Sequence, residues 1–426
     1  SVGSITGTPG NYSAQIILES TTNIDIGDYV LIKNLMGSGA FYLHYGIWKV
    51  TSIDSDTQIT ILNTCNYSSF PINTITKGDC VVLKTILTFN DCAGIVVGAN
   101  KTLGALDNLA IVGSSEYSKP NYGLVCGGYT ATNNAKANGC VYLGSKFGVS
   151  GFSASGIWAG YGSYIYCAGD VASCSNRQHG YEADTGGNIS TGWDVPSNPI
   201  ANGNCGNGFL AFNGGNIWIG QNSIACGNLM TGINSISGSI RVGSDTTCNY
   251  NVQDGIRADH SGSIICLSGV CCYNSRGVRA SLNSTIDAPN IDASNNNSVG
   301  FSADAGIIIA TATTSNNNKY GYSASNNSFI NASNSTALNS STAGFSSILN
   351  SLVNADNSVS QNNSVGYYAE DKGTLSAKNS NSSENTMISY SANIMSYINI
   401  AGAIGDTTTN IALNTLDATG SLISNQ

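Results

Sequence analysis

The sequence predicts an all-β protein whose main body is a parallel β-helix, with a small N-terminal β module and a short C-terminal β cap. Apolar anchor residues recur every 21 to 24 residues through the second half of the chain. A short second strand follows each anchor, and each repeat closes near an asparagine. One such repeat cannot bury its own apolar face, whereas stacked repeats share a continuous core.

The anchors open each repeat as a short strand. A small residue stands two positions after each anchor, so both point inward while the residue between them points to solvent. The strands are too short, and the segments between them too irregular, for a helical solenoid. Earlier coils trace back to Tyr181 and Ile157. The nine regular anchors are Phe209, Ile233, Ile256, Val278, Phe301, Tyr322, Phe345, Tyr367 and Tyr390.

The second strand of each repeat reads apolar-x-apolar or apolar-x-Ala, as in Ile217–Ile219 and Leu375–Ala377. Asparagines at equivalent turn positions of stacked coils predict ladders of side-chain amides. The asparagines expected in these ladders are Asn228, Asn251, Asn274, Asn297, Asn318, Asn339, Asn362 and Asn385.

We expect three parts in the chain: an N-terminal β-rich module over 1–90, the parallel β-helix over 91–386, and the last coil with a C-terminal cap or trimer contact over 387–426. Residues 25–63 alternate apolar and polar positions between turn signals, which indicates an antiparallel module. The insertion GWDVPSNP, in the coil that starts at Tyr181, predicts a loop on one face. The cap would protect the last coil from edge pairing.

Composition excludes several classes of function. A net charge of −9 and a pI near 4.6 disfavour nucleic acid as a ligand. No apolar stretch is long enough to insert into a membrane. The 13 cysteines are an odd number without a CxxC motif, so we expect reduced thiols, packed as small core residues in a protein that folds in a cytoplasm. No residue spacing predicts a metal site or a cofactor.

Chemically active side chains gather in the middle of the chain. All five arginines, two of the three histidines and three of the four tryptophans lie between residues 158 and 279. The coils after that point carry Ser- and Asn-rich exteriors over the same core pattern. Packing alone does not require this difference, so we place the functional surface on the coils from Ile157 to Val278.

Stacking turns equivalent positions into outward columns with a rise of about 4.8 Å per coil. Exposed aromatics in such columns are platforms for sugar rings. The position after the anchor gives the first column, which is Trp158, Glu182, Leu210, Asn234, Arg257 and Arg279. Two positions later stand Gly160, Asp184, Phe212, Ile236, Asp259 and Ser281. The second strand contributes Tyr166, Ser190, Trp218, Arg241, Ile265 and Asp287.

Glu182 and Asp184 stand two apart on one strand, so they face the same way with Cα atoms about 6.6 Å apart. A carboxylate pair of this kind suits glycoside hydrolysis, whether retaining or inverting. Asp259, flanked by Arg257 and His260, is a third catalytic candidate. A lyase would instead use His260 as the base and Arg257 to stabilise the enolate. The competing interpretation is that these carboxylates are solvated surface charges.

The coil motif GF-x-A, as in VGFSADAGIIIATATTSNNN and VGYYAEDKGTLSAKNS, resembles that of bacteriophage tailspike depolymerases with a pectate-lyase-like, right-handed parallel β-helix. The resemblance covers most of the chain and includes no catalytic signature. It implies a homotrimer on the virion tail, attached through an N-terminal segment missing from this chain, that binds and cleaves a bacterial capsular or O-antigen polysaccharide. The clustered aspartates with which pectate lyases bind calcium are not recognisable here.

We therefore expect a glycoside hydrolase acting on bacterial capsular polysaccharide, with Glu182, Asp184 and Asp259 as the catalytic candidates. A polysaccharide lyase and a non-catalytic glycan-binding adhesin remain the alternatives. The candidate substrate contacts are Trp158, His179, Tyr181, Trp218, Arg241, Arg257 and His260.

Overall fold

In the computed structural model the chain is all-β, and no described residue lies in a helix. The parallel strands form a solenoid of about 13 turns, preceded by a small antiparallel sheet, which confirms the predicted fold class. Two compact units make up the chain: residues 1–234 with 238–252, and residues 235–237 with 253–426. The structure describes residues 2–8, 11–37, 46–63, 75–98, 100–113, 120–127, 139–192, 197–405 and 421–424.

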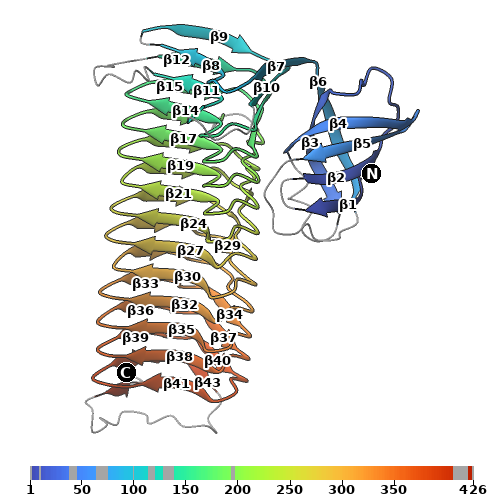
Figure 1. Cartoon of the computed structure of the whole chain (residues 1–426). Coiled ribbons are helices and arrows are strands. Elements are labelled where there is room, and N and C mark those ends of the chain that lie inside the picture. The colour runs from blue at the N-terminus through green and yellow to red at the C-terminus, as the bar shows by residue number, and fades with distance from the viewer. Residues whose placement is uncertain are drawn as a thin grey trace. The chain divides into compact units, whose positions relative to one another are not determined.

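The N-terminal module is a closed antiparallel barrel with strand order β1-β2-β5-β4-β3-β6, drawn in blue in Figure 1. Its apolar core, which includes Val30 and Trp48, continues into Cys174 and Ile200 of the solenoid. Gly148 permits this contact, because a Cβ atom there would lie 2.6 Å from the Ile47 side chain. The strands are β1 (Val2–Thr8), β2 (Asn11–Ile17), β3 (Tyr29–Gly37), β4 (Gly46–Ser55), β5 (Gln58–Asn63) and β6 (Ile75–Leu83).

Coils of the first unit contain up to three strands, each in its own parallel sheet. The first sheet contains β8 (Ile95–Val97), β11 (Leu124–Cys126), β14 (Ile157–Gly160), β17 (Tyr181–Asp184) and β19 (Phe209–Phe212), and β21 (Ile233–Ile236) lies at the unit boundary. The second contains β9 (Thr102–Leu106), β12 (Cys140–Leu143), β15 (Tyr164–Cys167), β18 (Asn188–Ser190), β20 (Asn216–Ile219) and β22 (Ser239–Val242). The third contains β7 (Thr85–Phe89), β10 (Leu109–Gly113), β13 (Lys146–Ser150) and β16 (Asp170–Cys174), and the short β23 (Thr246–Thr247) lies later in this unit.

The second unit repeats the same three-strand coil. Its first strands are β24 (Asp254–Asp259), β27 (Arg276–Ser281), β30 (Val299–Asp304), β32 (Tyr320–Ser325), β35 (Ala343–Ile348), β38 (Val365–Glu370) and β41 (Ile388–Ala392). Its second strands are β25 (Ser263–Cys266), β28 (Thr285–Asp287), β31 (Ile307–Ile309), β33 (Phe329–Asn331), β36 (Leu352–Asn354), β39 (Thr374–Ser376), β42 (Tyr397–Asn399) and β44 (Leu422–Ser424). Its third strands are β26 (Gly269–Val270), β29 (Ile291–Asp292), β34 (Thr336–Leu338), β37 (Val359–Gln361), β40 (Asn381–Ser383) and β43 (Ile404–Gly405).

The third strand found in most coils is absent from the sequence-based prediction, which had two strands per repeat. The later third strands, such as β34, β37 and β40, have three residues each and are mostly polar or small, so they carry little apolar signal. The earlier ones, such as β10 and β13, are apolar but lie in coils before the regular repeat. The predicted cap falls partly on residues 406–420, outside the described residues, and β44 after them pairs in parallel with β42. No helix long and apolar enough to cross a membrane occurs within the described ranges.

The predicted anchors form the aromatic core of the coils. Tyr181 stacks on Phe209 with ring centroids 4.6 Å apart in the first unit. In the second unit five anchor rings, from Phe301 to Tyr390, stack in sequence at 4.7 to 5.2 Å with nearly parallel planes. The ring spacing is close to the strand separation of about 4.8 Å, so strand register and ring stacking support each other.

An asparagine ladder runs through the first unit, as the sequence predicts. Each Nδ2 donates to the Oδ1 of the next residue at 3.1 Å, and the backbone N–H groups donate to the same oxygens. The ladder therefore satisfies amides that the coil buries. Its members are the predicted Asn228 and Asn251, together with Asn176 and Asn204, which the prediction did not include.

In the second unit the ladder includes Asn274, Asn318 and Asn385 as predicted, but three other predictions are wrong by one residue. The buried ladder positions are Asn296, Ser340 and Asn363, whereas their exposed neighbours Asn297, Asn339 and Asn362 lie outside it. Asn339 and Asn362 instead adopt the left-handed conformation, with φ of 56°. Asparagine suits both the ladder and the turn, so pairs of polar residues leave the register ambiguous.

Buried cysteines pack as small core residues. Cys126, Cys167, Cys174, Cys226 and Cys266 are buried and form no disulfide. Burial raises the pKa of the Cys174 thiol to about 12, which keeps it protonated and unreactive.

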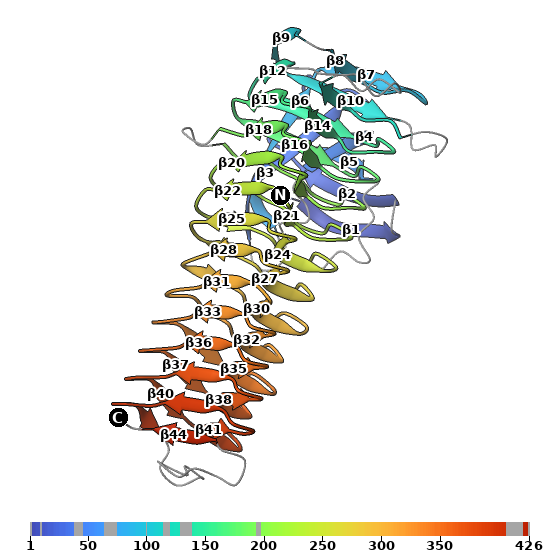
Figure 2. The same ribbon diagram turned by 90° about the vertical axis from the view of Figure 1, so that its left-hand side faces the viewer.

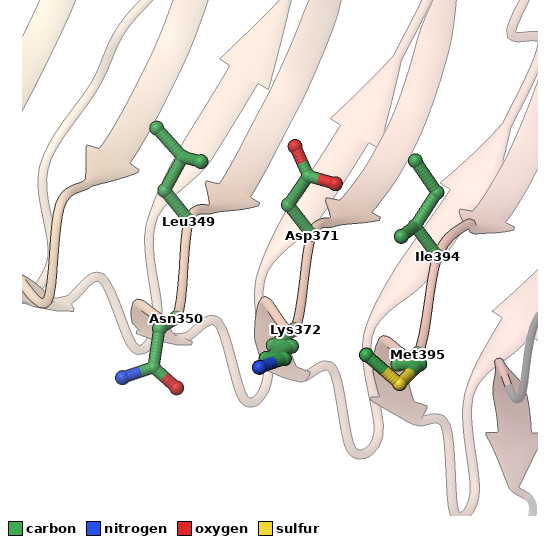
Figure 3. Close-up of a pocket in the computed structure, with 6 residues that line it drawn as sticks. All are labelled: Leu349, Asn350, Asp371, Lys372, Ile394 and Met395. Atoms are coloured by element: carbon green, nitrogen blue, oxygen red, sulfur yellow. The ribbon is translucent and has the colours of Figure 1, made fainter.

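Turns between the first and second strands of the last coils hold two consecutive residues in the left-handed conformation. Figure 3 shows three such turns side by side, with Leu349, Asp371 and Ile394 in one row and Asn350, Lys372 and Met395 in another. The φ angles of Ile394 and Met395 are 53° and 54°. A β-branched residue rarely adopts this conformation, because its Cβ crowds the following carbonyl.

Replacing Ile394 with Asn and Met395 with Gly is expected to raise the free energy of unfolding by about 1 kcal/mol, because the left-handed strain is relieved. Urea denaturation measures the change. The change Asn327→Gly, at an equivalent turn where Asn already has φ of 60°, is the control and should have a smaller effect. A loss of stability in the double variant would show that the exposed apolar side chains at this turn stabilise the coil.

Candidate active site

The carboxylate pair Glu182 and Asp184 lies on β17, in the first sheet of the first unit. Tyr181 and Ala183 point into the core, so the two carboxylates between and after them point outward, as predicted. Trp158 and Leu210 flank Glu182 on the neighbouring strands, and Gly160 and Phe212 flank Asp184. The pair therefore lies in register with residues of β14 and β19.

Glu182 lies in a largely desolvated site. The pKa of Glu182 is raised to about 7: burial raises it most, a hydrogen bond from Ser155 opposes the shift, and the adjacent charge of Asp184 adds to it. The Ser155 hydroxyl donates to the Glu182 carboxylate at 2.5 Å. A carboxyl with this pKa is about half protonated at neutral pH. The protonated form is the one that a general acid requires.

His179 is connected to Glu182 by hydrogen bonds through Ser155. Its backbone N–H donates to the Ser155 hydroxyl at 3.4 Å, and its Nδ1 accepts the Asn207 backbone N–H at 2.9 Å. Burial lowers the pKa of His179 to about 4, so the imidazole is neutral. Because Nδ1 accepts, the proton of the neutral ring lies on Nε2. His179 therefore supports the acidic residue without adding a positive charge.

Three aromatic rings gather beside the carboxylates. Trp158 contacts Tyr122 and Tyr161, with ring centroids 5.7 and 6.0 Å apart. A Cβ atom on Gly160 would lie 2.2 Å from the Trp158 ring, so the indole lies across this glycine, next to Asp184 in the adjacent strand. The exposed member is Tyr161, which is 42% exposed in the turn after β14.

Two predicted substrate contacts are buried. Trp158 is only 3% exposed, so it supports the aromatic cluster and is not the open platform that we expected. Tyr181 is an inward anchor, stacked on Phe209, and its hydroxyl donates to the Val171 carbonyl. Parity along the strand predicts which side faces out, but it does not predict whether neighbouring turns cover that side.

Trp218 and Arg241 are exposed, but they lie on the second sheet. Their strands β20 and β22 pair so that the two residues are neighbours, and Trp218 is 49% exposed. Tyr142 and Tyr166 precede them in the same outward direction. Figure 1 looks onto β14, β17 and β19 of the first sheet, whereas β18, β20 and β22 come into view in Figure 2. The single wall expected from the sequence is therefore two faces of the coil.

Asp259, in the second unit, is a paired carboxylate. Burial alone would raise its pKa, but hydrogen bonding and the charge of Arg257, with smaller effects of Ser281 and His260, lower the pKa below the usual value. Arg257 donates at 2.6 Å, the Ser281 hydroxyl at 3.1 Å, and His260 Nδ1 lies at 3.2 Å. An ionised, fully coordinated carboxylate is a poor general acid, but it can orient the exposed His260 ring.

Arginines outnumber carboxylates around Asp259. Arg276 forms an ion pair at 2.6 Å with the buried Asp254. The Arg279 side chain forms no hydrogen bond or ion pair with any described residue. Burial, followed by the charge of Arg276, lowers its pKa, while the charges of Asp254 and Asp259 oppose the shift. The half-buried Arg279 guanidinium is therefore available to an anionic ligand group.

Sequence reasoning did not select Ser155, Tyr122 or Tyr161. Ser155 and Tyr122 precede recognisable strands, and Tyr161 occupies a turn position that holds Thr or Asn in the next coils. One signal could have identified Tyr161: it stands before Gly162, in a turn next to the carboxylate column. Trp193 lies outside the described residues. Within the described part of the chain, no group of three or more His, Cys, Asp or Glu side chains is placed to hold a metal ion.

The sequence matches no protein-family model and no curated protein. Among solved structures, it is similar to the A-module of Azotobacter vinelandii mannuronan C-5 epimerase AlgE4, with 14% identity and a TM-score of 0.35 over 70% of this chain and 83% of that one. PfbA, a surface adhesin of Streptococcus pneumoniae, matches with 8% identity and a TM-score of 0.31 over 80% and 91%.

The catalytic domain of a GH87 α-1,3-glucanase, solved with tetrasaccharides, matches with 10% identity and a TM-score of 0.22 over 99% of this chain and 91% of that one. At such low identities and TM-scores, these similarities assign no activity to this chain.

Proposed function

We propose that the protein is a glycoside hydrolase that depolymerises a polysaccharide, with Glu182 as the general acid and Asp184 as its partner carboxylate. The observation that supports this most strongly is the environment of Glu182: burial holds its pKa near 7, two residues from a second outward carboxylate on the same strand. In glycosidases, one carboxyl group of the pair is kept protonated by its environment and acts as the acid. The other carboxylate acts as the base or nucleophile.

In the proposed reaction Glu182 donates its proton to the glycosidic oxygen as the bond to the anomeric carbon breaks. Asp184 either removes a proton from the attacking water or attacks the anomeric carbon itself, after which water releases the sugar. Both routes consume one water per bond cleaved. Tyr161 would stack on a sugar ring next to the scissile bond, because its exposed ring lies beside the carboxylates.

The biological setting that we propose is a bacteriophage tailspike, a homotrimer on the virion tail that cleaves a bacterial capsular or O-antigen polysaccharide. The repeated GF-x-A coil motif supports this proposal. The low charge and Ser- and Asn-rich surface also suit a ligand made mostly of hydroxyl groups.

A polysaccharide lyase is the second candidate, because Asp259 holds His260 by Nδ1 and leaves its Nε2 free to act as a base. The unpaired guanidinium of Arg279, one coil away from Arg257, would bind the carboxylate of a uronate. Such a site lacks the raised-pKa acid that the Glu182 site provides, so we favour hydrolysis.

Incubation with a panel of purified capsular and O-antigen polysaccharides tests the proposal, with product mass and absorbance near 232 nm read together. Fragments that gain one water support a hydrolase. An unsaturated chromophore would overturn it in favour of a lyase, and polysaccharide that binds without being cleaved would identify an adhesin.

Activity is expected to fall above about pH 7, because only protonated Glu182 can donate a proton. The folded-state pKa is raised above the ordinary value, so the protonated acid is present below about 7 and is lost as the pH rises through that value. A pH–rate profile of kcat/KM measures this limb. A lyase base would give the opposite trend, since activity would rise as the base loses its proton.

The variant Ser155→Ala checks the assignment of that limb to Glu182. Ser155 stabilises the ionised carboxylate, so its removal should move the high-pH limb upward. The change Ser153→Ala, two residues away, is the matched control and should leave the limb in place. An unchanged profile in Ser155→Ala would show that another group controls activity.

A further inference from the structure

A recess lies on the outer face of the first sheet in the second unit, in coils that the sequence indicates to be featureless. It has a volume of about 480 Å³, which falls within the range of small-molecule sites, about 300 to 1,000 Å³. It spans β30, β32, β35 and β38. The side chains that define its chemistry are Lys319, Tyr320, Ser323, Ser346, Tyr368 and Glu370.

Small residues beside large ones create the recess. Ser323, Ser346 and Tyr368 occupy one outward column on successive strands, so two small residues stand next to a tyrosine. Ser346 is only 1% exposed, so Ser323 is the serine that is open to the recess. Tyr320 stands at the start of β32, close enough to Tyr368 to influence its ionisation. The two tyrosines and Ser323 therefore line the same recess.

The charged side chains beside the two tyrosines, Lys319 and Glu370, each interact with one of the rings. The Lys319 ammonium lies 5.8 Å from the centroid of the Tyr320 ring. Burial, together with a hydrogen bond to the Glu370 carboxylate, raises the pKa of Tyr368 to about 12, so its phenol remains a donor. Lys319 and Glu370 carry opposite charges, so the site has no net charge to attract an anion or a cation.

We propose that this recess binds a short uncharged segment of an oligosaccharide, stacked on Tyr320 and Tyr368. Aromatic faces take the apolar faces of sugar rings, while serine, lysine and glutamate side chains match hydroxyl groups. A polyanion would need clustered cations, and an apolar peptide would need an apolar floor. The choice of a glycan rests on the proposed function, but binding here needs neither Glu182 nor Asp184.

Binding measurements on the catalytically disabled Glu182→Gln variant test this assignment. The probes are neutral dextran, mannan and α-1,3-glucan oligosaccharides, with charged alginate oligosaccharides for comparison, first as a printed array and then by calorimetry. Hydrogen exchange with the best-bound probe should show protection of residues 319–323, 342–348 and 365–370. Adding Tyr320→Ala and Tyr368→Ala should weaken its affinity at least about tenfold.

Two further variants separate binding from folding. Ser323→Phe fills the recess while keeping both tyrosines, and should weaken binding similarly. Tyr273→Ala removes a tyrosine that is 50% exposed and does not line the recess, so it should bind as its parent does. Far-UV circular dichroism confirms that each variant keeps its strands.

The outcomes distinguish this site from the proposed hydrolase. When Tyr320→Ala and Tyr368→Ala are made in the enzyme that keeps Glu182, a raised KM with unchanged kcat supports a site that binds the polysaccharide away from the reacting bond. Binding that depends on the tyrosines without any cleavage by the wild type also supports it, while contradicting the hydrolase. Tyrosine variants that bind and cleave like the wild type overturn the site and leave the hydrolase intact. Absence of binding to every probe overturns the site.

Discussion

Replacing Glu182 with Gln is expected to lower the rate of polysaccharide cleavage at least about 100-fold, the usual contribution of a general acid. Glutamine keeps the size of the side chain and can still accept the Ser155 hydrogen bond. It cannot give a proton to the glycosidic oxygen. Since the protonated glutamic acid and the amide are both uncharged, polysaccharide binding should change little.

Substrates with different leaving groups sharpen this test. An aryl glycoside whose leaving group needs no protonation should be cleaved by Glu182→Gln at nearly the wild-type rate, while the natural polymer is not. The exposed Glu384→Gln is the matched control and should retain full activity on both. Natural-polymer cleavage by Glu182→Gln within twofold of the wild type would remove Glu182 from the reaction.

Asp184→Asn complements that experiment, because the partner carboxylate acts on the other side of the anomeric carbon. Proton NMR of the first product formed by the wild type shows whether the anomer is retained or inverted. Retention would identify Asp184 as a nucleophile, and inversion as a base for water.

The repeat carried enough information to predict the coils but not their surfaces. Phe209, Phe301 and Tyr367 recur with a small residue two positions later, and only an inward strand position explains both. Burial of outward residues depends on the turns that flank them. Trp158 and Asn234 are outward by parity and yet almost inaccessible to solvent, and no spacing in the sequence encodes that.

The functional residues divide in the same way. Glu182 and Asp184 were predictable because alternation alone places them on one face. The pKa of Glu182 was not, since it depends on burial and on Ser155, which comes from the preceding coil. Tyr320 and Tyr368 were not predicted, because the coils that carry them contain no Arg, His or Trp. Their recess exists only because serines fill the neighbouring positions.

Ring stacking makes Phe345→Ala the substitution with the largest expected effect on stability. Phe345 is fully buried between Tyr322 and Tyr367, with ring centroids 4.7 and 5.1 Å away and planes within 6° of parallel. Its removal leaves a cavity between two rings. Each ring is held in place by a hydrogen bond of its hydroxyl, Tyr322 with Thr313 and Tyr367 with Ser358. The rings cannot easily collapse into the space, so the loss should be about 3 to 5 kcal/mol.

Urea denaturation measures this loss, and Tyr367→Phe is the control. That change keeps the ring and removes only the hydroxyl that pairs with Ser358, so it should reduce the free energy of unfolding by about 1 kcal/mol. Because each coil contacts only its neighbours, hydrogen exchange in Phe345→Ala should rise around β32, β35 and β38 and stay unchanged in the N-terminal barrel. A loss below about 1 kcal/mol for Phe345→Ala would mean that the backbone ladders, and not the aromatic stack, hold these coils together.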